Sequence, residues 1–345
     1  MALIDEIREQ PAVAQRLIAS PPAALARIAA VVARRRPQAV LIAARGSSDH
    51  AALYAQYLFA IRNSMLVALA TPSALTLYGA RPRLAHSLVI GISQSGRSPD
   101  IVAVIDEARR QGALTVAFTN EPGSPLAGAA AEVIELGAGV ERATAATKTY
   151  TAQLLAVALL SLALDAPSEA ERRALDGLSA LMERALTTEP AAARLAGARA
   201  AMERCVVLGR GFDYATAREW ALKLQELAQV HALPFSAADF EHGPLALAEP
   251  GLDVLAVAPA GPALRAQAKL LRRLHQIHGA RLVVVSDSAA ARAIDDGLTL
   301  PRGVADWLAP AVSIIPGQLF AYHLTRAKGL DTESPRTIRK VTETR

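Results

Sequence analysis

The sequence predicts an α/β protein made of two similar lobes, each with a mostly parallel sheet flanked by helices. Two observations carry this prediction. Short, continuous apolar runs bounded by glycine alternate with helical segments, a pattern typical of parallel strands buried on both faces. The same series of runs and turns also occurs twice along the chain. The length of 345 residues and a hydrophobic content of 52% are enough for two large cores.

The duplication is visible in pairs of motifs that keep their order in both halves. Arg-Gly follows an apolar run at residues 45–46 and again at 210–211. Ser-Gly at 95–96 and Ala-Gly at 260–261 end the next runs, and Gln-Leu recurs at 153 and 318 in long apolar helical segments. One such match could arise by chance in an Ala- and Leu-rich chain, whereas the ordered series indicates an internal repeat.

The predicted domain boundaries follow these runs. Between the repeats, a charged, Ala-rich stretch contains the capping-box pattern Ser168-x-x-Glu171 and is interpreted as helical connectors. The expected parts are an N-terminal helix (1–24), a first lobe (25–166), a helical connector (167–203), a second lobe (204–330) and a C-terminal tail (331–345).

Composition argues against several classes of protein. The net charge is only +5. The densest basic run, residues 34–36, ends a predicted helix, where cations complement the helix dipole. Because this explains the run without a nucleic acid, we expect no nucleic-acid partner. Cys205 is the only cysteine, which excludes an internal disulfide and a thiolate metal site. No secretory signal is evident, and the longest uncharged apolar stretch, 149–164, is short for a membrane span. These features predict a cytoplasmic protein without membrane contact.

The most informative local motif is Gly-Ile-Ser-Gln-Ser-Gly-Arg-Ser at residues 91–98. It lies between an apolar run and a helix, where backbone N–H groups and the helix dipole favour an anion. An ordinary turn with Ser98 as the N-cap is the alternative interpretation. A second serine turn, at residues 46–48, ends the preceding strand of the same lobe and favours phosphate binding. The equivalent turn of the second lobe, residues 259–261, has no hydroxyl groups.

The second lobe carries the charged residues that could perform acid–base chemistry. Lys223 and Glu226 are three residues apart on a predicted helix and share a face, although a solvated surface ion pair is an alternative interpretation. His242 precedes Gly-Pro, which predicts a shaped loop. The polar segment 335–342 follows, and a frayed terminus is its simplest interpretation.

Taken together and in order, these motifs resemble a known family, the tandem sugar-isomerase (SIS) lobes of glucosamine-6-phosphate synthase. The resemblance runs from about residue 25 to the C-terminus. It is carried by Gly46-Ser47-Ser48, Ser93-Gln94-Ser95-Gly96 with Ser98, Thr147-Lys148, Ala221-Leu222-Lys223-Leu224-Gln225-Glu226, Glu241-His242-Gly243-Pro244-Leu245-Ala246-Leu247, and Pro335-Arg336 with Lys340.

The resemblance implies a role for each matching position. Glu226 would be the base that moves a proton between C1 and C2 of the sugar, and Lys223 would stabilise the developing enediol charge. His242 would assist ring opening, reaching across from a second subunit, and Lys340 would close over the open-chain sugar, with Schiff-base chemistry possible. The phosphate and the sugar would be held by Ser47, Ser48, Ser93, Gln94, Ser95 and Ser98, with Ala145 and Ala146 in a sugar-side loop.

The departures from the synthase pattern shape the expected function. The synthase begins with a glutaminase domain whose N-terminal cysteine releases ammonia, and no such cysteine stands near the start of this sequence. The sugar-side loop reads Thr-Ala-Ala-Thr-Lys at 144–148 in place of Val-Ala-Ser-Thr-Lys.

The first hypothesis is therefore an aminosugar-phosphate deaminase/isomerase, which converts glucosamine 6-phosphate to fructose 6-phosphate and ammonia. The alternatives are the sugar-isomerase subunit of a glutamine-dependent synthase or another ketose/aldose phosphate isomerase, and a non-catalytic phosphosugar-binding regulatory protein. A hexose or hexosamine 6-phosphate is the expected ligand and a homodimer with shared active sites the expected assembly. Proton transfer between adjacent carbons requires no metal and no organic cofactor.

Overall fold

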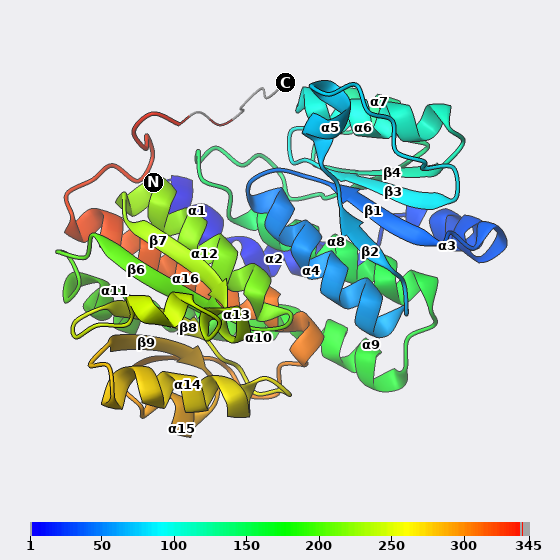
Figure 1. The fold of residues 1–345 in the computed structure, drawn as a ribbon. Coiled ribbons are helices and arrows are strands. Elements are labelled where there is room, and N and C mark those ends of the chain that lie inside the picture. The colour runs from blue at the N-terminus through cyan, green and yellow to red at the C-terminus, as the bar shows by residue number, and fades with distance from the viewer. Residues whose placement is uncertain (1, 339, 341–345) are drawn as a thin grey trace. The chain divides into compact units, whose positions relative to one another are not determined.

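The computed structural model describes residues 2–338 and residue 340 (Figure 1). Residue 339 and residues 341–345 of the predicted C-terminal tail lie outside the described residues. The chain forms two compact units. The N-terminal unit comprises residues 12–141, 148–175 and 340, and the C-terminal unit comprises residues 2–11, 142–147 and 176–338.

The N-terminal unit is built on a five-stranded parallel sheet. Its strands are β1 (Ala39–Ala43), β2 (Val67–Leu69), β3 (Ser87–Ile92), β4 (Leu114–Thr119) and β5 (Glu132–Glu135), in the order β2-β1-β3-β4-β5. Its helices are α3 (Ala24–Arg35), α4 (Ser47–Arg62), α5 (Pro72–Thr76), α6 (Pro99–Arg110), α7 (Pro125–Ala129), α8 (Lys148–Leu164) and, largely, α9 (Glu169–Asp176). Helices α5, α6 and α7 lie on one side of the sheet, and α4 and α8 lie on the other (Figure 1).

The C-terminal unit repeats this architecture. Its strands are β6 (Arg204–Gly209), β7 (His231–Ser236), β8 (Asp253–Val257), β9 (Arg281–Ser286) and β10 (Asp296–Thr299), all parallel, in the order β10-β9-β8-β6-β7. Its helices are α10 (Leu178–Leu186), α11 (Glu189–Gly197), α12 (Asp213–Ala228), α13 (Ala237–Phe240), α14 (Leu264–Gln276), α15 (Ala289–Arg292) and α16 (Ala309–Ala327), with 3-10 turns η1 (Pro244–Leu247) and η2 (Asp306–Leu308). Helices α14 and α15 cover one face of the sheet, and α12 and α16 cover the other (Figure 1).

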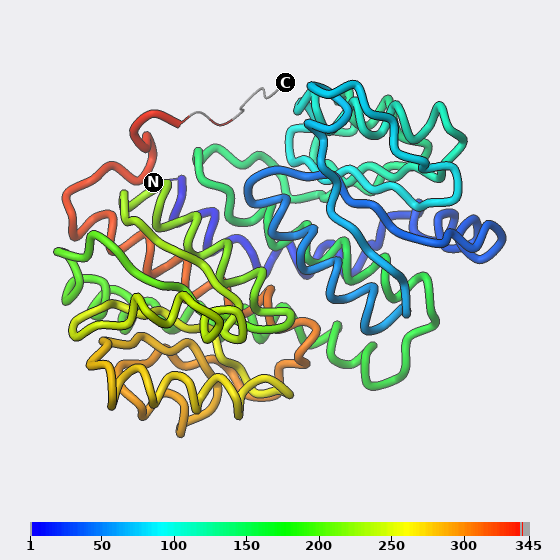
Figure 2. The backbone as a smooth tube through the Cα atoms, in the orientation of Figure 1, coloured from blue at the N-terminus to red at the C-terminus, as the bar shows by residue number. Residues whose placement is uncertain are grey.

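The predicted fold class and duplication are confirmed. In each sheet the strands lie side by side in the order second, first, third, fourth and fifth of that half. Strands β4 and β8 are buried along their whole length, because helices cover both faces of each sheet. Figure 2 traces the connections through α4 and α12, which link the first two strands of each half.

Helix α12 is held firmly in the C-terminal unit by α16. Trp220 of α12 is fully buried and meets the edge of Phe320 with ring centroids 5.7 Å apart. A Cβ at Gly317 of α16 would lie only 2.9 Å from the indole ring, so only glycine allows this close approach. The helix that carries the predicted base is therefore fixed by core packing.

The segment predicted as one N-terminal helix forms two, α1 (Ala2–Arg8) and α2 (Gln10–Ala19), and the predicted connector supplies α9, α10 and α11. The capping box before α9 is present, with the Glu171 N–H donating to Ser168 Oγ at 3.2 Å and the Ser168 N–H donating to the Glu171 carboxylate at 2.7 Å. No single helix among the described residues is long and apolar enough to cross a membrane, whereas α2 and α3, bent by 62°, pass this test only as a pair, by length and composition.

Candidate active site

Two serine turns of the N-terminal unit end neighbouring parallel strands. Strands β1 and β3 pair directly, so the turns that follow them reach the same edge of the sheet. Each turn leads into a helix, α4 after Gly46 and α6 after Ser98. Neither of these two N-cap residues caps its helix with a side chain, so the alternative role predicted for the Ser98 hydroxyl is not observed. Two helix N-termini with nearby hydroxyls are suited to a phosphate.

The turn after β3 is tightly shaped by its glycine. Gly96 has a φ of 61°, and a Cβ at this position would collide with the Ser124 side chain. The Gly96 N–H donates to Ser93 Oγ at 3.1 Å, and the Arg97 N–H approaches Ser95 Oγ at 3.4 Å. Ser93 is therefore partly engaged in holding the turn, whereas Ser95 and Ser98 are half-buried at its surface.

An ion pair that the sequence analysis missed links the two serine turns. Arg45 precedes Gly46, and its guanidinium lies 2.8 Å from the carboxylate of Asp100, in the first turn of α6. Asp100 is 1% exposed, so the surrounding residues hold its carboxylate in place within the pair. In the turn after β1, Gln153 of α8 donates to Ser48 Oγ at 2.9 Å. Arg45 belongs to the repeated Arg-Gly motif, which was the only sequence signal for this contact.

A buried line of charges runs along α12 in the C-terminal unit. Lys223 Nζ lies 2.6 Å from Glu226 Oε2 and 3.3 Å from Glu219 Oε1. The side chains of Glu219 and Lys223 are 0% and 1% exposed, whereas that of Glu226 is 23% exposed. The interpretation of Lys223 and Glu226 as a solvated surface pair is therefore wrong. Glu219 completes the line one turn earlier, and its i,i+4 spacing was available in the sequence.

Burial and the neighbouring carboxylates shift the pKa of Lys223 in opposite directions. Burial favours the neutral amine, but the carboxylates of Glu219 and Glu226 outweigh it and raise the pKa of Lys223 above its ordinary value. The ammonium is thus retained beside Glu226. Only Oε2 of Glu226 receives a hydrogen bond from the described residues, which leaves Oε1 as the oxygen that could accept a proton from a ligand.

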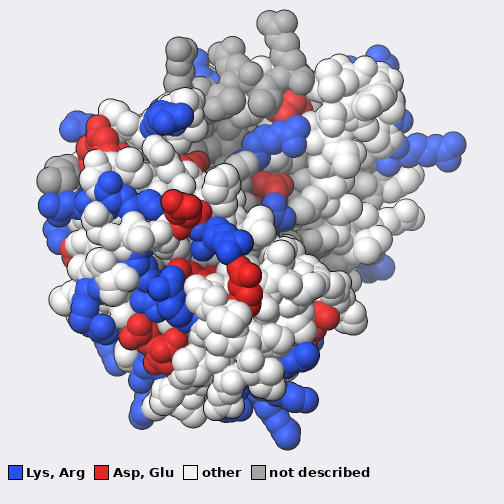
Figure 3. All heavy atoms as spheres, turned by 60° about the vertical axis from the view of Figure 1, so that its left-hand side comes forward, with Lys and Arg blue, Asp and Glu red and all other residues white. Residues whose placement is uncertain are grey.

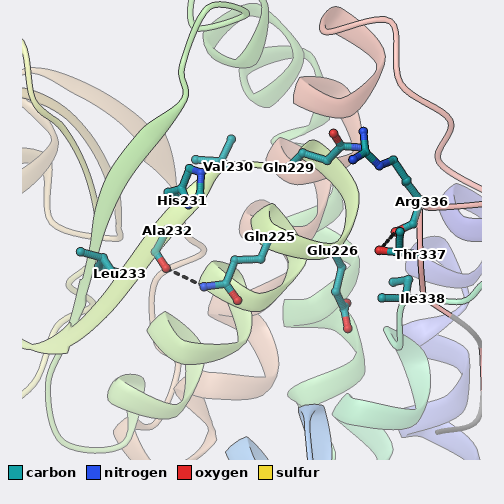
Figure 4. Close-up of a pocket in the computed structure, with 10 residues that line it drawn as sticks. All are labelled: Gln225, Glu226, Gln229, Val230, His231, Ala232, Leu233, Arg336, Thr337 and Ile338. Atoms are coloured by element: carbon teal, nitrogen blue, oxygen red, sulfur yellow. Dashed lines mark hydrogen bonds between the residues drawn. The ribbon is translucent and has the colours of Figure 1, made fainter.

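Glu226 lines a pocket of about 550 Å³ within the C-terminal unit (Figure 4). Figure 4 shows the end of α12, strand β7 and the segment 336–338 around this space, with Gln225 turned toward β7. Gln225 Nε2 donates to the Ala232 carbonyl at 2.7 Å. The lining residues are Gln225, Glu226, Gln229, Val230, His231, Ala232, Leu233, Arg336, Thr337 and Ile338.

The predicted histidine lies apart from this cluster. His242 is exposed on the turn between α13 and η1, where Gly243 has a φ of 117°. Phe240, fully buried, packs against Phe235 at a centroid distance of 5.6 Å and anchors the turn. Among the residues that the structure describes, no hydrogen bond or ion pair joins His242 to Glu226. The loop predicted from Gly-Pro is confirmed, and within one chain it does not bring His242 to the base.

The predicted tail lysine has an acidic partner in the N-terminal unit. Lys340 Nζ lies 2.7 Å from Glu141 Oε2, and the Glu141 side chain is fully buried. Glu141 also accepts hydrogen bonds from the N–H and hydroxyl of Thr149, at 3.1 and 2.7 Å, in the first turn of α8. The carboxylate is thus fixed by a helix N-terminus. Glu141, 199 residues from Lys340, was not identified from the sequence.

The two alanines of the predicted sugar-side loop differ in exposure. Ala145 is 1% exposed, backbone included, and Ala146 is half-buried, so only Ala146 of the two has surface open to a ligand. No group of three or more His, Cys, Asp or Glu residues suited to a metal ion occurs in the described part of the chain. On the face shown in Figure 3, acidic and basic side chains are interspersed, so the small positive charge is not gathered into one patch there.

Comparison with known proteins identifies the family. The SIS domain model matches residues 35–163 and 200–327. The glutamine–fructose-6-phosphate aminotransferase (isomerizing) of Methanothermobacter thermautotrophicus is 35% identical over 309 residues, which cover 87% of this chain and 51% of that protein. The chain therefore spans about half the length of such curated relatives.

Solved structures agree with this assignment. A candidate phosphosugar isomerase from Silicibacter pomeroyi DSS-3 is 34% identical, with a TM-score of 0.86 and coverage of 96% of this chain and 99% of that one. The C-terminal domain of glucosamine-fructose-6-phosphate aminotransferase from Francisella tularensis is 27% identical, with a TM-score of 0.89 and coverage of 97% and 98%. Two family matches, one on each sheet, and relatives along most of the chain show that this protein belongs to the SIS domain family.

Proposed function

We propose that this protein is a phosphosugar isomerase that moves a proton between C1 and C2 of a hexose 6-phosphate. The observation that carries the proposal is the buried Glu219–Lys223–Glu226 line, in which a partly exposed carboxylate stands beside a fixed ammonium ion. A non-catalytic binding protein has no need for such a costly arrangement, because each buried charge must be compensated.

In the proposed reaction Glu226 takes the proton from one carbon and returns it to the other. The electron pair of the broken C–H bond forms the enediol double bond, and the carbonyl oxygen gains the negative charge. The proton of the hydroxyl on the neighbouring carbon then moves to this oxygen, and the carbonyl re-forms on that neighbouring carbon as Glu226 returns its proton. Lys223 keeps Glu226 in position and favours negative charge close to the base. The serine turns after β1 and β3 bind the phosphate through hydroxyls and helix N-termini, which holds the substrate throughout the reaction.

Two further roles belong to the proposal. His242 acts in ring opening from a second copy of the chain in a homodimer, which its exposed position on a shaped turn permits. Lys340 engages the open-chain sugar after leaving Glu141, by a hydrogen bond or by a Schiff base to the carbonyl carbon with loss of water. The amine must give up its proton before a Schiff base forms, and the Glu141 carboxylate can accept it.

The comparisons favour the isomerase half of a glutamine-dependent synthase, or a related ketose/aldose isomerase, over the deaminase that the sequence analysis placed first. The relative reported above at 35% identity is an aminotransferase of the isomerizing kind. Deamination of glucosamine 6-phosphate uses the same C1–C2 proton transfer, so the site geometry is compatible with both reactions.

A substrate panel tests this function. Fructose 6-phosphate, glucose 6-phosphate, glucosamine 6-phosphate and the corresponding galactose-type sugars are incubated in D₂O with the purified protein. Conversion of ketose to aldose, deuterium incorporation at C1 or C2 and ammonia release are then measured. Deuterium incorporation that is lost in Glu226→Gln supports the proposal. If no sugar in the panel exchanges its proton while fructose 6-phosphate still binds, the protein is a binding module and the proposal is wrong.

A further inference from the structure

Helix α1 lies outside both SIS segments, yet it contacts the two residues directly before the predicted sugar-side loop (144–148). Glu6 is only 3% exposed. Its carboxylate accepts the backbone N–H of Arg142 at 2.5 Å and the backbone N–H of Ala143 at 3.2 Å. Helix α1 and residues 142–147 belong to the same compact unit, although 136 residues separate Glu6 from Arg142 in the sequence.

The position of Glu6 is itself fixed at both ends of its helix. The Ala2 N–H donates to the Glu333 carboxylate at 2.9 Å, which caps the start of α1. Just after α1, the fully buried Gln10 donates to Gln318 of α16 at 2.7 Å. Hydrogen bonds at the start of α1 and just after its end therefore hold this helix, and with it the Glu6 carboxylate, in place.

The loop depends on such a support. Residues 136–146 form no helix or strand, and Gly137 and Gly139 adopt positive φ values of 57° and 69°. Backbone N–H groups outside regular structure need other acceptors when they are buried. Glu6 supplies an acceptor for two successive N–H groups, and Ala143 and Ala145 are then buried. A carboxylate that bridges adjacent N–H groups fixes the backbone direction of the residues that follow.

We propose that Glu6 is a positioning residue for substrate binding, which sets the conformation of residues 144–147 through the Arg142 and Ala143 N–H groups. The inference rests on the proposed function, because it takes this loop as the one that faces the sugar. It adds to that function a residue outside the SIS match, and it gives helix α1 a role in binding the sugar rather than in folding alone.

The test compares Glu6→Gln with Glu183→Gln in the full chain. Glu183 lies on α10 of the same unit and is exposed, so its variant is a matched control for the loss of one carboxylate. In Glu6→Gln the side-chain length is kept, but an NH₂ group replaces one acceptor and faces a backbone donor. Hydrogen exchange of the peptide that contains residues 138–147 reports on the anchor, and KM and kcat for fructose 6-phosphate report on positioning.

We expect faster exchange at residues 142–143 and a KM raised roughly tenfold in Glu6→Gln, with kcat changed much less, because a displaced loop weakens substrate binding. Glu183→Gln should match the wild type in both measurements. Thermal melting monitors folding, and Glu6→Asp, which keeps the charge but is one methylene shorter, provides a second variant with the same expected direction. The proposal is overturned if exchange is unchanged, or if exchange rises while KM stays at the wild-type value.

Failure of the proposed function gives a different result. Wild-type protein that turns over no hexose 6-phosphate would remove the catalytic role of the loop and with it this assignment. Faster exchange in Glu6→Gln would then still show that helix α1 anchors the loop, and unchanged fructose 6-phosphate affinity in the same variant would show that the loop does not bind the sugar.

Discussion

The two units share one architecture and differ in the residues that follow their strands. After β3 the N-terminal unit has Ser93, Ser95 and Ser98, whereas the equivalent turn after β8 reads Pro-Ala-Gly at residues 259–261. The helix that follows the first strand of each unit shows the opposite difference, because here the C-terminal unit has the polar residues. Helix α12 carries Glu219, Lys223 and Glu226, whereas the positions of α4 that align through the Arg-Gly turns hold Tyr54, Leu58 and Ile61.

This comparison shows how a duplicated fold can divide one chemical task. The sheets and their strand order are kept because buried apolar runs and helix packing determine them. Side chains at strand ends and on one helix face can change with little effect on that core. One unit thus retains neutral hydroxyls suited to an anion, and the other retains charged groups suited to proton transfer.

The largest expected effect concerns the base of the C-terminal unit. Glu226→Gln should lower kcat by about a thousandfold, because an amide cannot accept the proton, while the affinity for fructose 6-phosphate changes little. Turnover and equilibrium binding are measured on the same preparation. Glu241→Gln is the matched control, since Glu241 is exposed and is not among the residues that line the pocket. A parallel loss of binding would remove the proposed division between the units.

The second prediction concerns the stability of the C-terminal unit. Asp213, at the start of α12, is buried and accepts the Ser313 hydroxyl at 2.6 Å and the Thr216 hydroxyl at 3.3 Å. Burial raises its pKa to about 7, although the two hydroxyl donors oppose the shift. The folded state therefore binds a proton that the unfolded state releases near pH 4, so this contribution to stability is present at low pH and is lost as the pH rises through about 7.

Asp213→Asn should remove this pH dependence. Its free energy of unfolding should exceed that of the wild type at pH 8, by on the order of 3 kcal/mol, and approach it near pH 4, because the amide stays neutral at both values. Urea denaturation across pH 4–8 provides the measurement. Equal pH profiles for the two proteins would contradict the prediction.

A third prediction concerns the serine turn of the N-terminal unit. Ser95→Ala combined with Ser98→Ala should raise KM roughly ten- to a hundredfold with a small change in kcat, because two hydroxyl donors to the phosphate are lost. Steady-state kinetics with fructose 6-phosphate measure both constants. The control is Ser87→Ala, since Ser87 is the first residue of β3 and lies at the opposite end of that strand from the turn. If the double variant resembles Glu226→Gln, the two units do not have separate tasks.

The smallest expected effect concerns the stability of the N-terminal unit. Its pH dependence is opposite to the one that Asp213 gives the C-terminal unit. Arg62 lies 2.7 Å from Glu171 and, through its hydrogen bond, lowers the pKa of that carboxyl to about 2. This stabilisation is present above about pH 4.5 and is lost as the pH falls toward 2. Glu171→Gln should lose about 1–2 kcal/mol at pH 7 and nothing near pH 2, as measured by urea denaturation. A loss that persists at pH 2 would show that the capping box, not the ion pair, is responsible.

Patterns among neighbouring residues were enough to predict the fold class and the duplication, and they singled out the serine turn and the charged pair on α12 as site candidates. Continuous apolar runs predict buried parallel strands because each residue must be apolar when both faces of a sheet are covered. Gly96 between serines and the i,i+3 pair of Lys223 and Glu226 are local patterns, so their spacing alone placed them on a turn and a helix.

The folded chain was needed to show which charged residues are buried and which distant segments meet. Glu6 reaches Arg142 across 136 residues and Glu141 reaches Lys340 across 199, and no periodicity or spacing connects such pairs. The burial of Lys223 and the exposure of His242 depend likewise on neighbours supplied by other elements. Local geometry is encoded in adjacent residues, whereas charge compensation depends on contacts that exist only once the chain has folded.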